Sequence, residues 1–285
     1  VISLCGFSFV IPSILIVFSV IKIFGYNGIL NKYFNFYDLI SIESIYGLKA
    51  ILIAHVLLNA PFATRLFVQN LNNIPKNYYE ISESINLSFF GNIFKLEIPI
   101  IRQSLFAVFS IIFSLCFLSF AIVMALGGSP KNSTLEVAIF QYALFDLNFN
   151  KAIMLSFIQI IICIIFVFIG FYKFKGSNFF EIGPIKYKHP HKNKILIKLI
   201  DYFLIIFFSI FLFSPVILLY SEFLKSIFFK IELTYTFIHA FINSILISLS
   251  TGVVVSIFGL LISYLLVINH KNFLLQQLLF LTSSM

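Results

Sequence analysis

Polar side chains that could carry chemistry are few in this sequence, and their spacing does not build an enzyme site. Three cysteines each lie in an apolar stretch and lack a C-x-x-C partner: Cys5, Cys116 and Cys163. We expect small buried residues here, because a disulfide framework or a metal site needs an even, clustered set. His189 and His191 flank Pro190 without Cys or carboxylate neighbours, a poor set of metal ligands. The sequence therefore predicts no catalytic residues, no metal and no cofactor.

A second group of polar side chains lies inside apolar stretches. His55 and Asn59 are four residues apart and would share one helix face, while Arg65 lies near the inner end of the same stretch. Ser119 is a similar candidate in the next stretch, and the aromatic ring of its neighbour Phe120 could stack on an aromatic solute. Such groups either line a translocation path or bond neighbouring helices to each other, and both interpretations stay open for these five residues.

The elements that would position these side chains are apolar and long. Of the 285 residues, 60% are hydrophobic and 11% charged, against ~45–50% and ~25% in an ordinary soluble domain. Continuous rather than alternating apolar runs favour helices over strands, and each run is long enough to cross a bilayer. The runs are 2–24, 47–70, 103–126, 151–172, 199–221 and 237–268, with a seventh from near 275. We predict an all-α, polytopic transmembrane helical bundle and exclude a soluble, disordered or nucleic-acid-binding protein.

The basic residues predict the orientation of this bundle. Segments 71–102, 173–198 and 269–274 hold eleven Lys and Arg residues, whereas 25–46, 127–150 and 222–236 hold four. The positive-inside rule therefore places the first set in the cytoplasm. The net charge of +8 is then mainly a topology signal, and the Lys-rich stretch 186–198 would lie beside anionic lipid rather than nucleic acid.

The cytoplasmic segment between the second and third apolar runs, 74–99, is more than a connector. After Pro75 the apolar residues recur at helical spacing, and a second turn of helix is predicted from Phe90 to Leu96 beyond a polar break at 86–88. We expect Pro99 to end this element before the next span. The expected apolar face comprises Tyr79, Ile81, Ile85 and Leu87–Phe89. Such a helix–turn–helix needs a partner surface to cover it.

This segment resembles the EAA coupling loop of ATP-binding cassette (ABC) importer permeases. Glu80 matches the motif's Glu, Ile81 and Ser82 stand where two Ala are usual, Asn86 stands at the Gly, and Pro99 matches the Pro thirteen residues later. Asn tolerates a left-handed backbone better than most residues, so the turn can survive. The resemblance implies a loop that docks into a separate ATPase subunit. The chain itself contains no G-x-x-x-x-G-K-[ST] motif.

Two further stretches, 46–75 and 117–141, narrow the resemblance. The second contains Ser119–Ala121, Leu126–Gly128 and Thr134–Ile139 and is similar to the permeases of thiamine or thiamine pyrophosphate importers, a branch related to ferric-iron permeases. The resemblance implies type I importer (MetI-like) architecture, a multi-pass location in the bacterial inner membrane, a periplasmic substrate-binding protein as a further partner, and thiamine or its phosphates as substrate. A ferric-iron or other small-solute ABC permease is the alternative, and an ion-coupled secondary transporter is disfavoured because charges gather at span ends.

The same resemblance divides the chain and suggests that it is an internal fragment of a longer protein. Residues 1–172 would be the later part of a first permease domain, 173–198 a cytoplasmic linker, and 199–285 the start of a second domain. On the outer side, a turn at Gly127–Gly128 would lead into an interfacial helix from Thr134 to Phe145. Glu136 would lie in its first turn, where it suits the helix dipole or contacts the cationic substrate or the binding protein.

Overall fold

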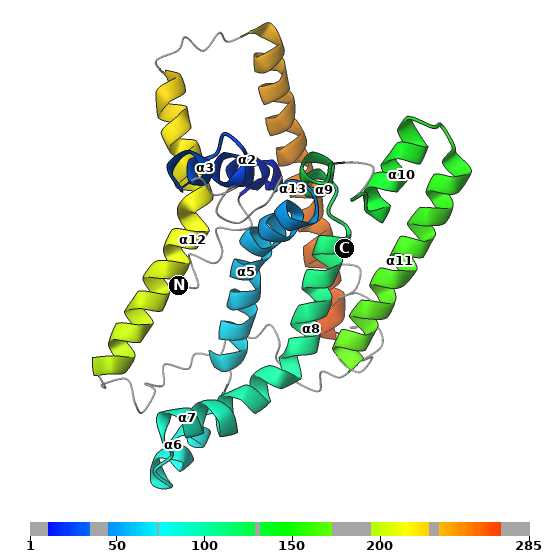
Figure 1. Ribbon diagram of the computed structural model, residues 1–285. Helices are drawn as coiled ribbons and strands as arrows, with labels where there is room; N and C mark the ends of the chain where they lie inside the picture. Colours follow the sequence, from blue (N-terminus) through cyan, green and yellow to red (C-terminus); the bar gives the residue numbers. More distant parts are fainter. Residues whose placement is uncertain are drawn as a thin grey trace. The chain divides into compact units, whose positions relative to one another are not determined.

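The computed structural model describes residues 11–34, 45–72, 74–128, 132–172, 195–227 and 234–268, and every regular element in these ranges is helical (Figure 1). The helices are α2 (Ser13–Phe24), α3 (Ile29–Phe34), α5 (Leu48–Asn72), α6 (Lys76–Ser84), α7 (Phe89–Asn92), the π-helix η2 (Ile93–Glu97), α8 (Ile98–Phe117), α9 (Ala121–Leu126), α10 (Leu135–Leu144), α11 (Phe149–Tyr172), α12 (Ile195–Ile227) and α13 (Tyr235–Ile268). The all-α prediction is therefore confirmed.

The chain divides into two units, Val1–Tyr220 and Ser221–Met285, which we describe separately. Among the described residues, four helices are long and apolar enough to cross a membrane, or up to six when each bent pair is one span. This agrees with the six predicted spans. Several predicted features lie outside the described residues: Cys5, His189, His191, most of the linker 173–198, and the seventh apolar run near 275.

The third span differs from its predicted course. The helix α8 ends at Phe117, and α9 begins only at Ala121, so the expected continuous helix over 103–126 is wrong. Phe120, in the break, packs its ring against Phe140 of α10 with 4.6 Å between ring centroids. The break lets α9 turn away from α8 and pack on α2 and α5, which buries apolar side chains that a straight helix would carry elsewhere.

Pro99 also plays a different part from the one predicted. It is the second residue of α8, and helical backbone runs from Phe89 through to Phe117. A proline cannot donate a backbone hydrogen bond, and its ring clashes with the carbonyl four residues earlier. The π-helix η2 immediately before it, in which the amide of Ile98 donates to the carbonyl of Ile93, gives the wider turn that this proline needs. The prediction that Pro99 ends the element is therefore wrong.

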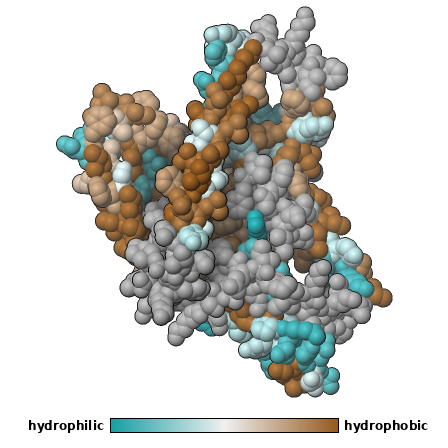
Figure 2. Space-filling view, turned by 180° about the vertical axis from the view of Figure 1, so that it is seen from behind, coloured by the Kyte–Doolittle hydropathy of each residue, from teal (hydrophilic) through white to brown (hydrophobic). Residues whose placement is uncertain are grey.

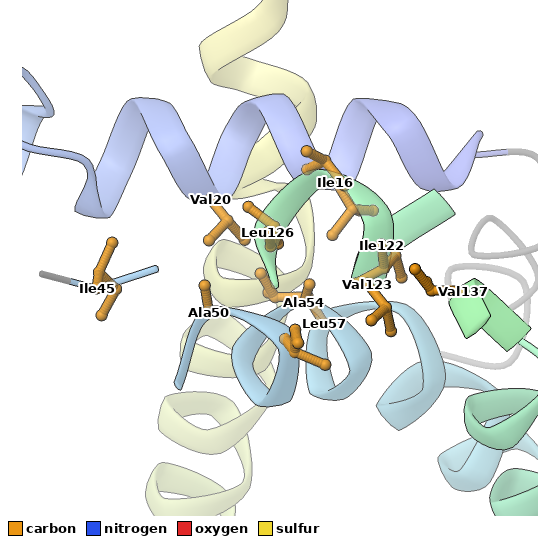
Figure 3. Close-up of a cluster of buried hydrophobic side chains, with 12 residues drawn as sticks. Ile16, Val20, Ile45, Ala50, Ala54, Leu57, Ile122, Val123, Leu126 and Val137 are labelled. Carbon is orange, nitrogen blue, oxygen red and sulfur yellow. The ribbon is translucent and has the colours of Figure 1, made fainter. Parts of the chain in front are cut away.

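The largest hydrophobic cluster lies where α9 meets α2 and α5 (Figure 3). Ile122 and Leu126 of α9 are fully buried there, in one cluster with Ala50 and Ala54 of α5. Small residues on one helix allow close approach of the next, which is how membrane helices gain packing contacts without a water-driven force. Figure 1 shows α9 and α10 at one end of α5 and α8, and α6 and α7 at the other.

A second close contact joins α8 to α11. A side chain on Gly170 would meet Ser110 and the carbonyl oxygen of Phe106, so the two helices touch backbone to backbone at this point. Further along the same pair, Phe113 and Phe166 stack with ring centroids 3.9 Å apart. The span α8 is thus held on one side by α5 and on the other by α11. Its helical backbone continues into the α7–η2 segment through a bend of 51° between Phe89–Arg102 and Ser104–Phe117.

Candidate functional site

The segment 74–99 folds as the predicted helix–turn–helix. The turn between α6 and α7 depends on Asn86, whose φ of +51° lies in the left-handed region. This conformation brings the amide of Leu87 within 3.0 Å of the carbonyl of Ser82. Ser88 then starts α7 by accepting a hydrogen bond from the amide of Gly91 on its side-chain oxygen, at 3.1 Å. The expectation that Asn at the Gly position preserves the turn is confirmed.

An exposed apolar stripe runs along this segment. Tyr78, Ile81 and Ile85 are 54%, 60% and 63% exposed and recur at helical spacing on one side of α6 and its C-cap. Phe90 and Phe94 of the following turns are 67% and 64% exposed. We call these five residues the docking surface. Figure 2 shows hydrophobic atoms among mainly hydrophilic ones at the α6–α7 end, at the bottom of the view.

The opposite side of α6 packs inward. Tyr79 and Ser82 are buried, and the hydroxyl of Tyr79 donates to Oε1 of Glu97 at 3.2 Å. The sequence placed Tyr79 on the same face as Ile81 and Ile85, and this is wrong. Two residues along a helix correspond to a rotation of about 200°, so Tyr79 and Ile81 point in nearly opposite directions. Tyr79 is therefore an internal contact of the loop and not part of the docking surface.

The motif positions fall into exposed and buried sets. Glu80 is exposed and pairs with Lys76 at 2.8 Å, and this hydrogen bond and charge raise the pKa of Lys76 above its ordinary value. Ile81 belongs to the docking surface. Ser82 is 2% exposed and donates to the carbonyl of Tyr79 at 2.7 Å, so only a small side chain fits where the motif usually has Ala. Pro99 lies at the start of α8.

The polar residues of α5 also differ in their burial and in their hydrogen-bond partners. Asn59 is buried and donates to the carbonyl of His55 at 3.0 Å and to Sγ of Cys116 on α8 at 3.4 Å. It thus bonds one helix to its neighbour. His55 is half-buried, and its Nδ1 has no hydrogen-bond partner among the described residues. Arg65 is half-buried, and no ion pair to it occurs in the described part of the chain. A path-lining role for His55 and Arg65 stays a prediction.

Ser119 and Phe120 occupy the break between α8 and α9. The amide of Ser119 donates to the carbonyl of Cys116 at 3.2 Å, closing the end of α8. The ring of Phe120 contacts Phe140, which in turn lies 5.8 Å from Phe145 between ring centroids. Both candidates therefore lie at a bend of the backbone, next to an aromatic group contributed by α10, and contact with a substrate stays a prediction.

The outer helix forms as predicted, with Thr134 as its N-cap residue and Glu136 in its first turn. The carboxylate of Glu136 accepts a hydrogen bond from Nε2 of Gln159 on α11. Gln159 is 3% exposed, and one turn later Cys163 is buried beside Ser114 of α8. Glu136 therefore has a partner within the bundle, and its contact with a substrate or binding protein stays a prediction.

Gln159 is the polar residue that the sequence interpretation missed. It is the one side-chain amide inside the apolar run 151–172, and this was the signal that could have identified it. At 1.5 Å per residue it lies about 15 Å along α11 from Phe149. Because α10 packs along α11, its first turn reaches well below the outer end of that helix.

The chain is similar in sequence to known transport proteins. Residues 3–175 match the model of the binding-protein-dependent transport system inner membrane component family. The chain is 35% identical over 215 residues to the thiamine transport system permease protein ThiP of Haemophilus influenzae, which covers 75% of this chain and 39% of that protein. It is 35% identical over 167 residues to ThiP of Salmonella typhimurium (59% of this chain, 31% of that protein) and 35% identical over 161 residues to ThiP of Escherichia coli (56% and 30%).

This chain spans about two-fifths or less of the length of these relatives. No solved structure gives a significant match. With the family model covering more than half of the chain, and with helices suited to a membrane, the chain belongs to the family of binding-protein-dependent transport system inner membrane components and is a multi-pass inner-membrane protein.

Proposed function

We propose that this chain is part of the permease of an ABC importer that moves thiamine or its phosphates across the bacterial inner membrane. The family membership supports the transport class, and the names of the three relatives support the substrate. A family of binding-protein-dependent transporters also speaks against an ion-coupled secondary transporter. The permease would take its energy from a separate ATPase, because the chain carries no phosphate-binding loop of its own.

The docking surface is the observation that carries the proposal. An apolar stripe on a segment that the charge distribution places in the cytoplasm is costly to leave in water and fits a hydrophobic groove on a partner. We assign that partner as the ATP-binding cassette ATPase subunit. The α9–α10 end lies at the other end of α5 and α8, and would face the periplasmic substrate-binding protein.

The remaining assignments follow from this orientation. We propose that His55, Asn59 and Arg65 line or brace the translocation path on one side, and that Ser119 and Phe120 contribute at the bend of the third span. Thr134 and Glu136 would belong to the outer part of the same region. Residues 1–172 would then form the later part of one permease domain and 199–285 the start of a second, joined by a cytoplasmic linker.

The docking surface can be tested with charge insertions in the full-length permease, co-expressed with its ATPase. Ile81→Asp and Ile85→Asp place a charge within the stripe, while Glu83→Lys changes a charge at an exposed position about 200° around the helix from both. We expect the first two to lose ATPase co-purification and Glu83→Lys to keep it. Full ATPase retention by both stripe variants would show that this surface is not the docking site.

The substrate is tested separately by uptake of labelled thiamine into cells that carry the full-length permease and its partners. Saturable thiamine uptake, competed by thiamine pyrophosphate and not by ferric iron, is the expected result. Transport of ferric iron without thiamine uptake would refute the substrate assignment and leave the importer class standing.

A further inference from the structure

We propose that Tyr79 and Glu97 are positioning residues that tie the docking helix α6 to the base of the span α8, so that displacement of the docking surface reaches the membrane. The inference rests on the proposed function, since it concerns how docking is converted into movement. It assigns roles to two residues outside the matched positions of the EAA motif.

The tie joins two elements that are eighteen residues apart in sequence. The hydroxyl of Tyr79, buried on the inner side of α6, donates to Oε1 of Glu97 at 3.2 Å. Glu97 is the last residue of η2, and α8 begins at the next residue. At 3.2 Å between the two oxygens, this is a long hydrogen bond of ordinary strength and not a short charge-assisted one. The contact therefore bridges the docking helix to the end of η2, immediately before α8 and ahead of the 51° bend between Phe89–Arg102 and Ser104–Phe117.

The covalent route between the same two elements is less rigid. It passes through the turn at 85–88, with its left-handed Asn86, and then through the π-helix η2. A turn interrupts the α-helical hydrogen-bond ladder, and a π-helix replaces it with the rarer bonds between residues five apart. Between them, the side-chain amide of Asn92 is buried without a partner among the described residues. The backbone path alone would let α6 pivot, and the Tyr79–Glu97 contact restrains that pivot.

The two sides of α6 then have different tasks. The exposed stripe with Ile81 and Ile85 receives the partner, and the buried side with Tyr79 and Ser82 passes the movement on to η2 and α8. Removal of the hydroxyl of Tyr79 should leave the docking surface intact, because that hydroxyl is on the side away from the stripe. The two functions are therefore separable by mutation.

The experiment uses the full-length permease with its ATPase and binding protein in proteoliposomes. Tyr79→Phe removes only the hydroxyl, Glu97→Leu removes the acceptor, and Glu97→Gln keeps a carbonyl oxygen of nearly the same reach. Tyr202→Phe, at an exposed position on α12, is the matched control for loss of a tyrosine hydroxyl. The readouts are ATPase co-purification and the ratio of substrate imported to ATP hydrolysed.

We expect Tyr79→Phe and Glu97→Leu to keep the ATPase at wild-type stoichiometry while substrate imported per ATP falls by about fivefold, the scale of one ordinary hydrogen bond. Glu97→Gln should recover most of the ratio, and the double variant Tyr79→Phe/Glu97→Leu should be no worse than either single one. Wild-type coupling in Tyr79→Phe would overturn the inference. Parallel loss of ATPase binding would also overturn it, since it would show a merely structural role. Failure of the Ile81 and Ile85 tests above would instead refute the docking proposal.

Discussion

Replacing Gly170 with alanine tests the closest helix contact in the bundle. A β-carbon at this position would lie 2.6 Å from Cβ of Ser110 and 2.9 Å from the carbonyl oxygen of Phe106, and closer still to Oγ of Ser110. Carbon atoms in contact are normally ~3.5–4.0 Å apart. The α8 and α11 backbones must therefore separate, because the Phe106 oxygen belongs to the main chain and cannot rotate away.

The magnitude follows from two opposing effects. Overpacking of this kind costs ~1–3 kcal/mol, while alanine gains ~1 kcal/mol over glycine in a helix interior. We expect Gly170→Ala to destabilise the permease by a net ~1 kcal/mol and so to lower its apparent melting temperature. Leucine brings a similar backbone gain, but its side chain is much larger than that of alanine. Gly170→Leu should therefore destabilise the permease by up to ~3 kcal/mol.

The assay is the loss of the monodisperse peak of the full-length permease after heating in detergent, followed by size-exclusion chromatography. Gly252→Ala on α13 is the matched control, because a β-carbon there meets no atom within 4 Å. It should be neutral or slightly stabilising. Ser110→Gly, which removes the two nearest obstructing atoms, should restore part of the loss when combined with Gly170→Ala. If Gly170→Ala matches Gly252→Ala, or if Ser110→Gly gives no rescue, the close contact of α8 with α11 is wrong.

Three further substitutions test local geometry by the same thermal assay. Asn86→Gly should preserve the turn, and Asn86→Val should cost ~1–2 kcal/mol because a branched side chain disfavours positive φ; equal stability of the two would contradict the left-handed turn. Asn59→Leu should cost ~0.6 kcal/mol, the usual value of a polar contact between membrane helices, and Cys116→Ser should retain the contact; a larger loss in Cys116→Ser would disprove the bond. Glu136→Gln should keep a partner for Gln159, whereas Glu136→Leu should cost ~1–3 kcal/mol by leaving a buried amide unpaired; equal effects would show that the pair does not matter.

The sequence predicts those parts of the fold that depend on local patterns. The continuous apolar runs locate α5, α11 and α13 to within about two residues at each end, because burial in lipid demands helices of that length wherever such runs occur. The turn at Asn86 is also local, since it needs only one residue that accepts a left-handed backbone. These features are determined almost entirely by residues that are close to one another in sequence.

Other features depend on contacts between distant residues, and local patterns do not contain them. The break before α9 coincides with Phe120 packing on Phe140, twenty residues later. The apolar face of α6 was assigned too broadly because Tyr79 has an apolar ring and also a hydroxyl, and its partner, Glu97, is eighteen residues away. The role of Glu136 likewise required knowledge that α10 lies along α11 and meets Gln159.

The polar groups within the spans show how structure changes the search for a translocation path. Several hydroxyls satisfy themselves on their own helix, as Thr64 does by donating to the carbonyl of Ala60 and Ser110 to that of Phe106, both at 2.8 Å. The side-chain amide of Asn59 bonds α5 to α8. A group whose bonding capacity is spent inside the bundle has little left for a passing solute. By this criterion His55 and Arg65, and not Asn59, stay the predicted contacts of the transported molecule on α5, because the described residues give no partner to the Nδ1 of His55 and no ion pair to Arg65.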